Sequence, residues 1–224
     1  DVKDKRCALK HAVAQALADV LPTWYQALPS GAYSDTPHAR GQRLLKNVLL
    51  DLALTAGLDA DGWAGEQYDK ASCMSERLGA LTAMVEYGLP CADERLADFY
   101  QRFADEPLVI DLWFAVQAKA TGQSVASLAA LMSRDDYDWH TPNRVRSVLS
   151  ALANKPVQLW SGDGLSLYLS AVERLDEINP VLSARLLSAL ARWHTLNDDD
   201  RPQVLAKLTD LKANVHSKNV LECL

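Results

Sequence analysis

The chain has few of the residues from which β-sheets are built. Its 224 residues include 2 Ile, 8 Thr and 16 Val, against 36 Leu and 32 Ala. Strands draw on β-branched side chains, whereas helices favour Leu and Ala. The composition therefore argues against an all-β fold and favours an all-α one, in a chain long enough to bury a sizeable core.

Excess positive charge and long apolar runs are also missing. The net charge is -6 at pH 7, so the chain lacks the excess positive charge that attracts nucleic-acid phosphates or anionic lipids. No run of about 18 consecutive apolar residues exists that could span a bilayer. We therefore expect neither a nucleic acid nor a membrane as a partner.

Cysteine is scarce and scattered. Cys7, Cys73, Cys91 and Cys223 lie far apart and form no CxxC pair, which is not the pattern of a disulfide framework. This usage is typical of a reducing compartment, and we expect a cytoplasmic protein. Because the chain begins with Asp1 rather than Met, we interpret it as a piece of a longer protein, with a processed N-terminus as the alternative.

Catalytic and metal-binding motifs are missing as well. A helical zinc site needs two His residues one turn apart with a carboxylate nearby, as in HExxH. The five His residues stand alone, and no GxSxG, Walker loop or GxGxxG occurs. We expect this chain to contribute no catalytic residue, to bind no metal and to need no cofactor.

Apolar residues recur at helical spacing almost everywhere. Proline follows a cap-type side chain at Thr36-Pro37, Thr141-Pro142 and Asn179-Pro180, which marks helix starts, and Pro22 should kink or split the first helix. The segment from Pro156 to Gly164 is expected to be a loop. The pattern predicts helices over residues 2–28, 38–57, 64–71, 73–88, 92–105, 107–121, 123–133, 142–154, 164–178, 180–194, 201–213 and 215–224.

Short connections between these helices favour antiparallel neighbours. Each helical hairpin takes about 35–45 residues, the length of HEAT and armadillo units, although no consensus sequence recurs. No stretch reads as a flexible linker. We predict one all-α domain over residues 1–224, a superhelical stack of antiparallel helix pairs that forms an α-solenoid.

Two arginines flank apolar stripes instead of lying opposite them. At 100° per residue, Arg185 lies about 60° from Leu182, and Arg146 lies about 60° from Leu149. Periodicity alone favours snorkelling or a salt bridge with a neighbouring helix for both side chains.

Four strings together resemble the C-terminal helical domain of bacterial aminopeptidase N, a gluzincin-type zinc aminopeptidase family. The first is MSERLGAL from Met74, and the second is DLWFAVQA from Asp111. The third is PNRVRSV from Pro142. The fourth is a spaced motif that consists of Leu175, Asn179-Pro180 and Arg185-Leu186. In order and spacing they cover the chain from about residue 40 to near its end.

The resemblance implies a parent enzyme of the membrane alanyl aminopeptidase type, which removes N-terminal amino acids from peptides. Its zinc belongs to a catalytic domain absent from this chain. The helical domain is then a non-catalytic cap that limits access to the active-site chamber, with other domains of the same polypeptide and peptide substrates as its partners. The resemblance also implies that Arg146 and Arg185 face this cavity and bind substrate.

An alternative function remains open at this point. An independent α-solenoid can also serve as a protein-binding scaffold through its concave face. A stand-alone hydrolase is disfavoured, because no nucleophile, base and metal can be assembled from the sequence.

Overall fold

All regular elements among the described residues are helices, and none is a strand. The structure, a computed structural model, describes residues 2–29, 32–58 and 61–224. Its contacts divide the chain into two compact units, Asp1–Arg102 and Phe103–Leu224. The predicted all-α architecture is confirmed. No helix in the described ranges is both long and apolar enough to cross a bilayer.

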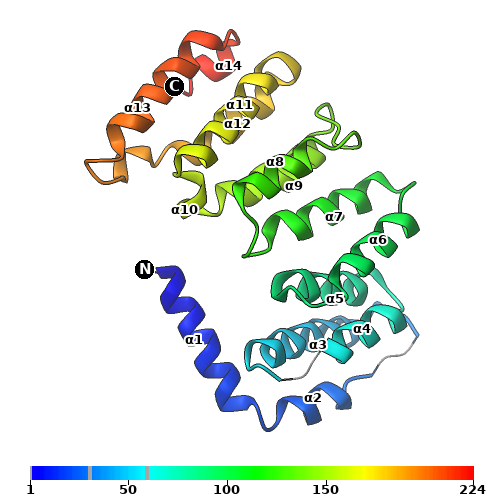
Figure 1. The fold of residues 1–224 in the computed structure, drawn as a ribbon. Coiled ribbons are helices and arrows are strands. Elements are labelled where there is room, and N and C mark those ends of the chain that lie inside the picture. Colours follow the sequence, from blue (N-terminus) through cyan, green and yellow to red (C-terminus); the bar gives the residue numbers. More distant parts are fainter. Residues whose placement is uncertain (1, 30–31, 59–60) are drawn as a thin grey trace. The chain divides into compact units, whose positions relative to one another are not determined.

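The first unit consists of helices that pack around a core of large apolar side chains. Its fully buried members include Leu50, Tyr68, Leu81, Met84 and Phe99. The helices of this unit (Figure 1) are α1 (Val2–Leu17), α2 (Leu21–Ala27), α3 (Pro37–Thr55), α4 (Asp61–Lys70), α5 (Met74–Tyr87) and α6 (Ala92–Arg102).

Hydrogen bonds show how these helices run. Gln67 on α4 donates to the carbonyl oxygen of Glu76, near the start of α5, so α4 and α5 form an antiparallel hairpin. Asn47 on α3 donates to the carbonyl oxygen of Ser75, near the start of α5. One turn later on α3, the Asp51 carboxylate accepts from the hydroxyl of Tyr87, at the end of α5. The helices α3 and α5 therefore run in parallel, as alternate helices of a solenoid do.

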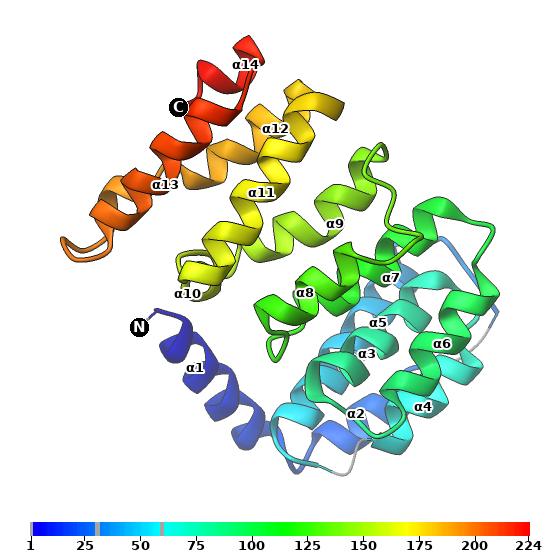
Figure 2. The same ribbon diagram turned by 45° about the horizontal axis from the view of Figure 1, so that its top comes forward.

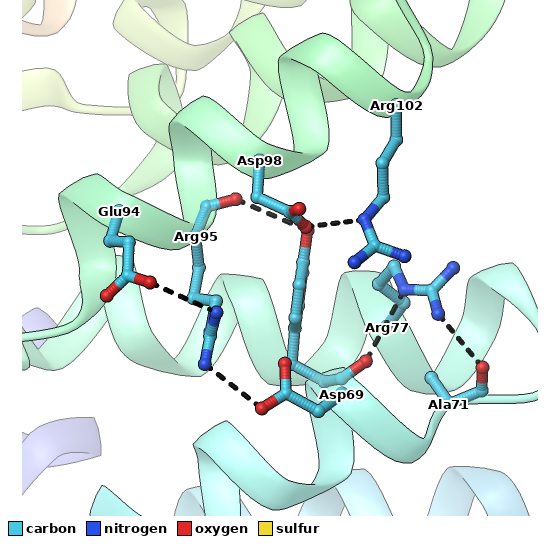
Figure 3. A network of polar contacts seen from close by, with 8 residues as sticks. Asp69, Ala71, Arg77, Glu94, Arg95, Asp98 and Arg102 are labelled. Carbon is cyan, nitrogen blue, oxygen red and sulfur yellow. Dashed lines mark hydrogen bonds and ion pairs between the residues drawn. The ribbon is translucent and has the colours of Figure 1, made fainter.

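A polar network ties α4 to α5 and α6 (Figure 3). The hydroxyl of Tyr68 donates to Asp98 at 2.8 Å, and Arg102 donates to the same carboxylate at 2.6 Å. The guanidinium groups of Arg77 and Arg95 both lie over the Tyr68 ring, at 5.6 and 5.7 Å from its centroid. This network supports the packing of α4 on α5 and α6.

The second unit also consists of helices that pack around an apolar core. Its fully buried side chains include Phe114, Leu128, Leu149, Leu152 and Tyr168. Its elements (Figure 2) are α7 (Pro107–Lys119), α8 (Val125–Met132), α9 (Pro142–Ala153), α10 (Pro156–Leu159), α11 (Gly162–Ile178), α12 (Pro180–Leu187), the 3-10 turns η1 (Ser188–Leu190) and η2 (Trp193–Thr195), α13 (Arg201–Asn214) and α14 (Lys218–Leu221).

The helices α11 and α12 form an antiparallel hairpin. Tyr168 donates to the carbonyl oxygen of Leu186, and Ser183 donates to that of Val172. The turn is short because the Asn179 side chain accepts from the Leu182 N–H and caps α12 directly after α11 ends. Two buried hydrogen bonds and one cap thus fix the register of this hairpin.

A buried ion pair joins α7 to α9. Arg144 Nε lies 2.6 Å from an Asp111 carboxylate oxygen, and both side chains are nearly inaccessible to solvent. The same guanidinium also donates to the Asp136 carbonyl oxygen and lies over the Phe114 ring. Because a buried charge without a partner is costly, this pair constrains how α9 packs on α7.

The helix starts marked in the sequence are confirmed, and Pro22 does split the first predicted helix. The helix α1 ends at Leu17 and α2 begins at Leu21. Thr36 and Asn179 cap their helices by accepting backbone N–H groups. Thr141 makes no such bond and donates its hydroxyl to Asp138 instead.

Three predicted segments are wrong in detail. The stretch from Pro156 to Gly164 is not a loop, since it contains α10 and the first turn of α11. The helix predicted over 180–194 ends at Leu187 and continues as 3-10 turns. The helix predicted over 215–224 covers only Lys218–Leu221. Four-residue helices complete barely one turn, so they leave no periodic signal.

Candidate functional site: a pocket bordered by three arginines

A pocket of about 620 Å³ lies within the second unit. Helices α9, α10, α11 and α12 and the turn after α12 supply its walls. The volume falls in the range of small-molecule and peptide pockets. The lining consists of Arg146, Ser150, Ala153, Asn154, Pro156, Leu159, Trp160, Tyr168, Leu182, Arg185, Leu186, Ser188, Ala189 and Arg192.

Helical spacing explains which side chains of α9 reach the pocket. Arg146, Ser150 and Asn154 follow one another at intervals of four residues, so they lie on one face of the helix. The opposite side of α9 carries Val148 and Leu152, which are buried in the core. One polar face of α9 therefore forms a wall of the pocket.

The helix α12 contributes both apolar and charged groups. Leu182, Arg185 and Leu186 recur at helical spacing and all line the pocket. The two leucines are almost fully buried, whereas Arg185 is exposed. The pocket thus has an apolar base and guanidinium groups along its accessible side, an arrangement that suits a ligand with an anionic group.

Three arginines, Arg146, Arg185 and Arg192, border the pocket and form no salt bridge with any described residue. Arg146 donates to the neutral Asn143 side chain on its own helix. Among the described lining residues there is no Asp or Glu. Periodicity favoured snorkelling or a salt bridge with a neighbouring helix for Arg146 and Arg185. Neither arginine forms such a salt bridge with a described residue.

The connection from α10 to α11 fixes the wall that carries Trp160. Ser161 caps α11 by accepting the Gly164 N–H at 3.0 Å, and its hydroxyl donates to the Gln158 carbonyl oxygen at 2.6 Å. A Cβ atom at Gly164 would collide with that same carbonyl oxygen. Only glycine therefore allows α11 to start so close to α10.

Tyr168 lines the base of the pocket and is fully buried. Burial raises the pKa of its hydroxyl, because the charged form would lose its hydration. Its proton is engaged by the Leu186 carbonyl oxygen at 3.0 Å. Tyr168 therefore supports the pocket structurally and is not placed to exchange protons with a ligand.

The pocket has no group suited to zinc. Its lining contains neither His nor Cys. Elsewhere in the described ranges no cluster of three or more His, Cys, Asp or Glu side chains could hold a metal ion. The described lining residues of this pocket therefore do not fit a zinc ion, which the family resemblance assigns to a domain outside this chain.

The structure brings together the two arginines singled out in the sequence. Sequence reasoning missed Ser150, Asn154, Trp160 and Arg192. The four-residue spacing from Arg146 could have indicated the first two. Arg192 lies seven residues after Arg185, which places it near the same face of a helix, but the two 3-10 turns that shape this segment have no clear sequence signal.

The helical fold and the arginine-bordered pocket place this protein in the class of all-α solenoids. The family described as "Domain of unknown function (DUF3458_C) ARM repeats" matches residues 1–224. The chain belongs to this family, and the armadillo-type repeat in that description agrees with the observed stack of helices.

The curated relatives are aminopeptidases. Aminopeptidase N of Caulobacter vibrioides is 30% identical over 222 residues, covering 96% of this chain and 26% of the relative. Aminopeptidase N of Escherichia coli (strain K12) is 30% identical over 217 residues, covering 94% and 25%. Aminopeptidase N of Haemophilus influenzae is 29% identical over 206 residues, covering 90% and 23%. This chain thus spans about a quarter of each relative and matches its C-terminal part.

A solved structure shares the fold. It is aminopeptidase A of Legionella pneumophila, determined in complex with aspartic acid. The TM-score is 0.87 at 24% identity, and the match covers 99% of this chain and 28% of the other. At this identity the likeness establishes the fold alone.

Proposed function

We propose that this chain is the C-terminal domain of a zinc-dependent aminopeptidase, where it caps the active-site chamber and binds the trailing end of the peptide. The match to the C-terminal quarter of aminopeptidase N supports the first part. The observation that carries the second is the pocket bordered by Arg146, Arg185 and Arg192 without an acidic side chain among its described lining residues.

A peptide's free carboxylate fits this pocket chemically. A guanidinium can donate two parallel hydrogen bonds to a carboxylate, and each charge-assisted bond is worth about 1.5–3 kcal/mol. Because Arg185 has no competing carboxylate among the described residues, it can form such bonds without breaking an existing ion pair. Ser150, Asn154 and Ser188 provide additional polar groups for the peptide backbone.

The remaining parts of the proposal concern the parent protein. Its catalytic domain would hold the zinc ion and cleave the N-terminal residue from short peptides. The domains of the same polypeptide and its peptide substrates would be the partners of this chain. The four separate, unpaired cysteines support a cytoplasmic location.

Kinetics of the full-length protein test the role of the arginines. Arg146→Ala and Arg185→Ala should each raise KM for tri- and tetrapeptides about tenfold, with kcat nearly unchanged, since they remove binding that is equal in ground and transition states. An aminoacyl anilide, which lacks a trailing carboxylate, should be cleaved with unchanged kinetics.

Arg40→Ala is a matched control. Arg40 is exposed and pairs with Asp35 on the surface, and it does not line the pocket. This variant should leave all three substrates unaffected. If Arg146→Ala and Arg185→Ala impair the anilide as much as the peptides and also lower Tm, the arginines are structural and the proposed binding role is wrong.

A further inference from the structure

The pocket carries more positive charge than one peptide carboxylate can neutralise. Its three arginines come from different parts of the second unit: Arg146 from α9, Arg185 from α12 and Arg192 from the turn between η1 and η2. None of the three forms an ion pair with a described residue, and the described lining includes no acidic side chain. Three like charges bordering one pocket repel one another unless an anion lies between them.

A single carboxylate leaves part of this charge unpaired. Its two oxygens can accept a bidentate pair of bonds from one guanidinium and further bonds from a second. Arg146 and Arg185 therefore suffice for the free end of a peptide. The third guanidinium, that of Arg192, remains without an acceptor of opposite charge.

Resting on the function proposed above, we infer that this pocket selects peptides whose last residue is Glu or Asp, and that Arg192 determines this preference. Such a residue carries two carboxylates, one on the main chain and one on the side chain. The main-chain carboxylate binds Arg146 and Arg185, and the side-chain carboxylate binds Arg192.

The size and the base of the pocket agree with this substrate class. A volume of about 620 Å³ exceeds what one carboxylate fills, so a whole terminal residue with its side chain is accommodated. Leu182, Leu186 and Trp160 supply an apolar surface for the methylene groups of Glu. A C-terminal Glu residue thus places its methylene groups against the apolar base of the pocket and its two carboxylates beside the guanidinium groups.

The test compares two nearly isosteric tetrapeptides, Ala-Ala-Ala-Glu and Ala-Ala-Ala-Gln, as substrates of the full-length protein. The wild type should show a KM about tenfold lower for the Glu peptide, as expected for one charge-assisted interaction. Arg192→Gln should remove this preference by raising KM for the Glu peptide to that of the Gln peptide, with kcat unchanged. Arg192→Lys, which keeps the charge, should retain part of the preference.

The outcomes separate this inference from the function on which it rests. If Arg146→Ala and Arg185→Ala raise KM for both peptides but the wild type does not distinguish Glu from Gln, the pocket binds peptide ends without acidic preference and the inference is wrong. A preference that survives Arg192→Gln also overturns it. If none of the three arginine variants changes KM for any peptide, the proposed function itself fails.

Discussion

Two arginines only two positions apart in the sequence have different environments. Arg144 is buried and paired with Asp111, whereas Arg146 is half-buried at the border of the pocket. Both belong to the string from Pro142 that resembles the aminopeptidase family. Helical periodicity singled out Arg146 and the resemblance implied its binding role, whereas only the structure shows that Arg144 pairs with Asp111. A pattern of residue types does not distinguish a charge that supports packing from one available to a ligand.

The Asp111–Arg144 pair leads to a stability prediction. Arg144→Met should reduce the free energy of unfolding by about 3–5 kcal/mol, because it leaves the Asp111 carboxylate buried without its cation. The double variant Asp111→Leu/Arg144→Met should recover most of this loss, since it removes both buried charges. Urea unfolding of the three proteins measures this. If the double variant is as unstable as the single one, the cost arises from lost packing of the arginine side chain.

Gly164 offers a second test, with its neighbour Gly162 as the matched control. A Cβ at Gly164 would collide with the Gln158 carbonyl oxygen, whereas a Cβ at Gly162 meets nothing within 4 Å. Gly164→Ala should therefore cost at least about 1–3 kcal/mol, as overpacking does. Gly162→Ala should be neutral or slightly stabilising, because alanine favours helices. Equal Tm values for the two variants would show that α10 and α11 are not packed as described.

At the scale of elements, side-chain contacts hold short helices that lack periodicity of their own. The four-residue helix α14 begins at Lys218, directly after its cap residue Ser217, and Asp176 on α11 anchors it. The Asp176 carboxylate accepts the backbone N–H groups of His216 and Ser217 at 2.7 and 3.1 Å, and also the Ser217 hydroxyl. The sequence over-predicted this helix as 215–224, because periodicity cannot show where one carboxylate fixes a helix start.

The contacts of Asp176 make its contribution depend on pH. Desolvation by burial tends to raise the pKa of this carboxyl, but the hydrogen bonds from Ser217 and His216 outweigh it and lower the pKa below its ordinary value. Because the folded-state pKa is lower than the unfolded one, the stabilisation is present in full above about pH 4 and is lost as pH falls through the folded pKa.

Unfolding measured from pH 7 to pH 3 checks this expectation. The difference in free energy of unfolding between the wild type and Asp176→Asn should be largest near neutral pH and should shrink below about pH 4. A difference that stays constant over this range would mean that Asp176 contributes by shape and not through its charge.

At the scale of the whole molecule, the sequence indicated the fold class and the order of the main helices. Leu and Ala content and helical spacing are properties of long segments, so they remain informative without a structure. The pocket was only partly predictable. Arg146 and Arg185 could be selected by periodicity and resemblance together, whereas Trp160 and Arg192 lie in or beside turns whose geometry depends on tertiary packing. The single domain predicted over residues 1–224 stays a prediction beside the two compact units.

The most direct test of the arginine pocket compares a peptide acid with its amide. In the full-length protein, Ala-Ala-Ala-Ala should have a KM about tenfold lower than the same tetrapeptide with a C-terminal amide, because the amide removes one charged acceptor. In Arg185→Ala the difference between the two KM values should shrink, because only Arg146 remains to bind the carboxylate, with kcat unchanged. If the acid and the amide have the same KM in the wild type, or if Arg185→Ala affects both equally, this pocket does not bind the trailing carboxylate.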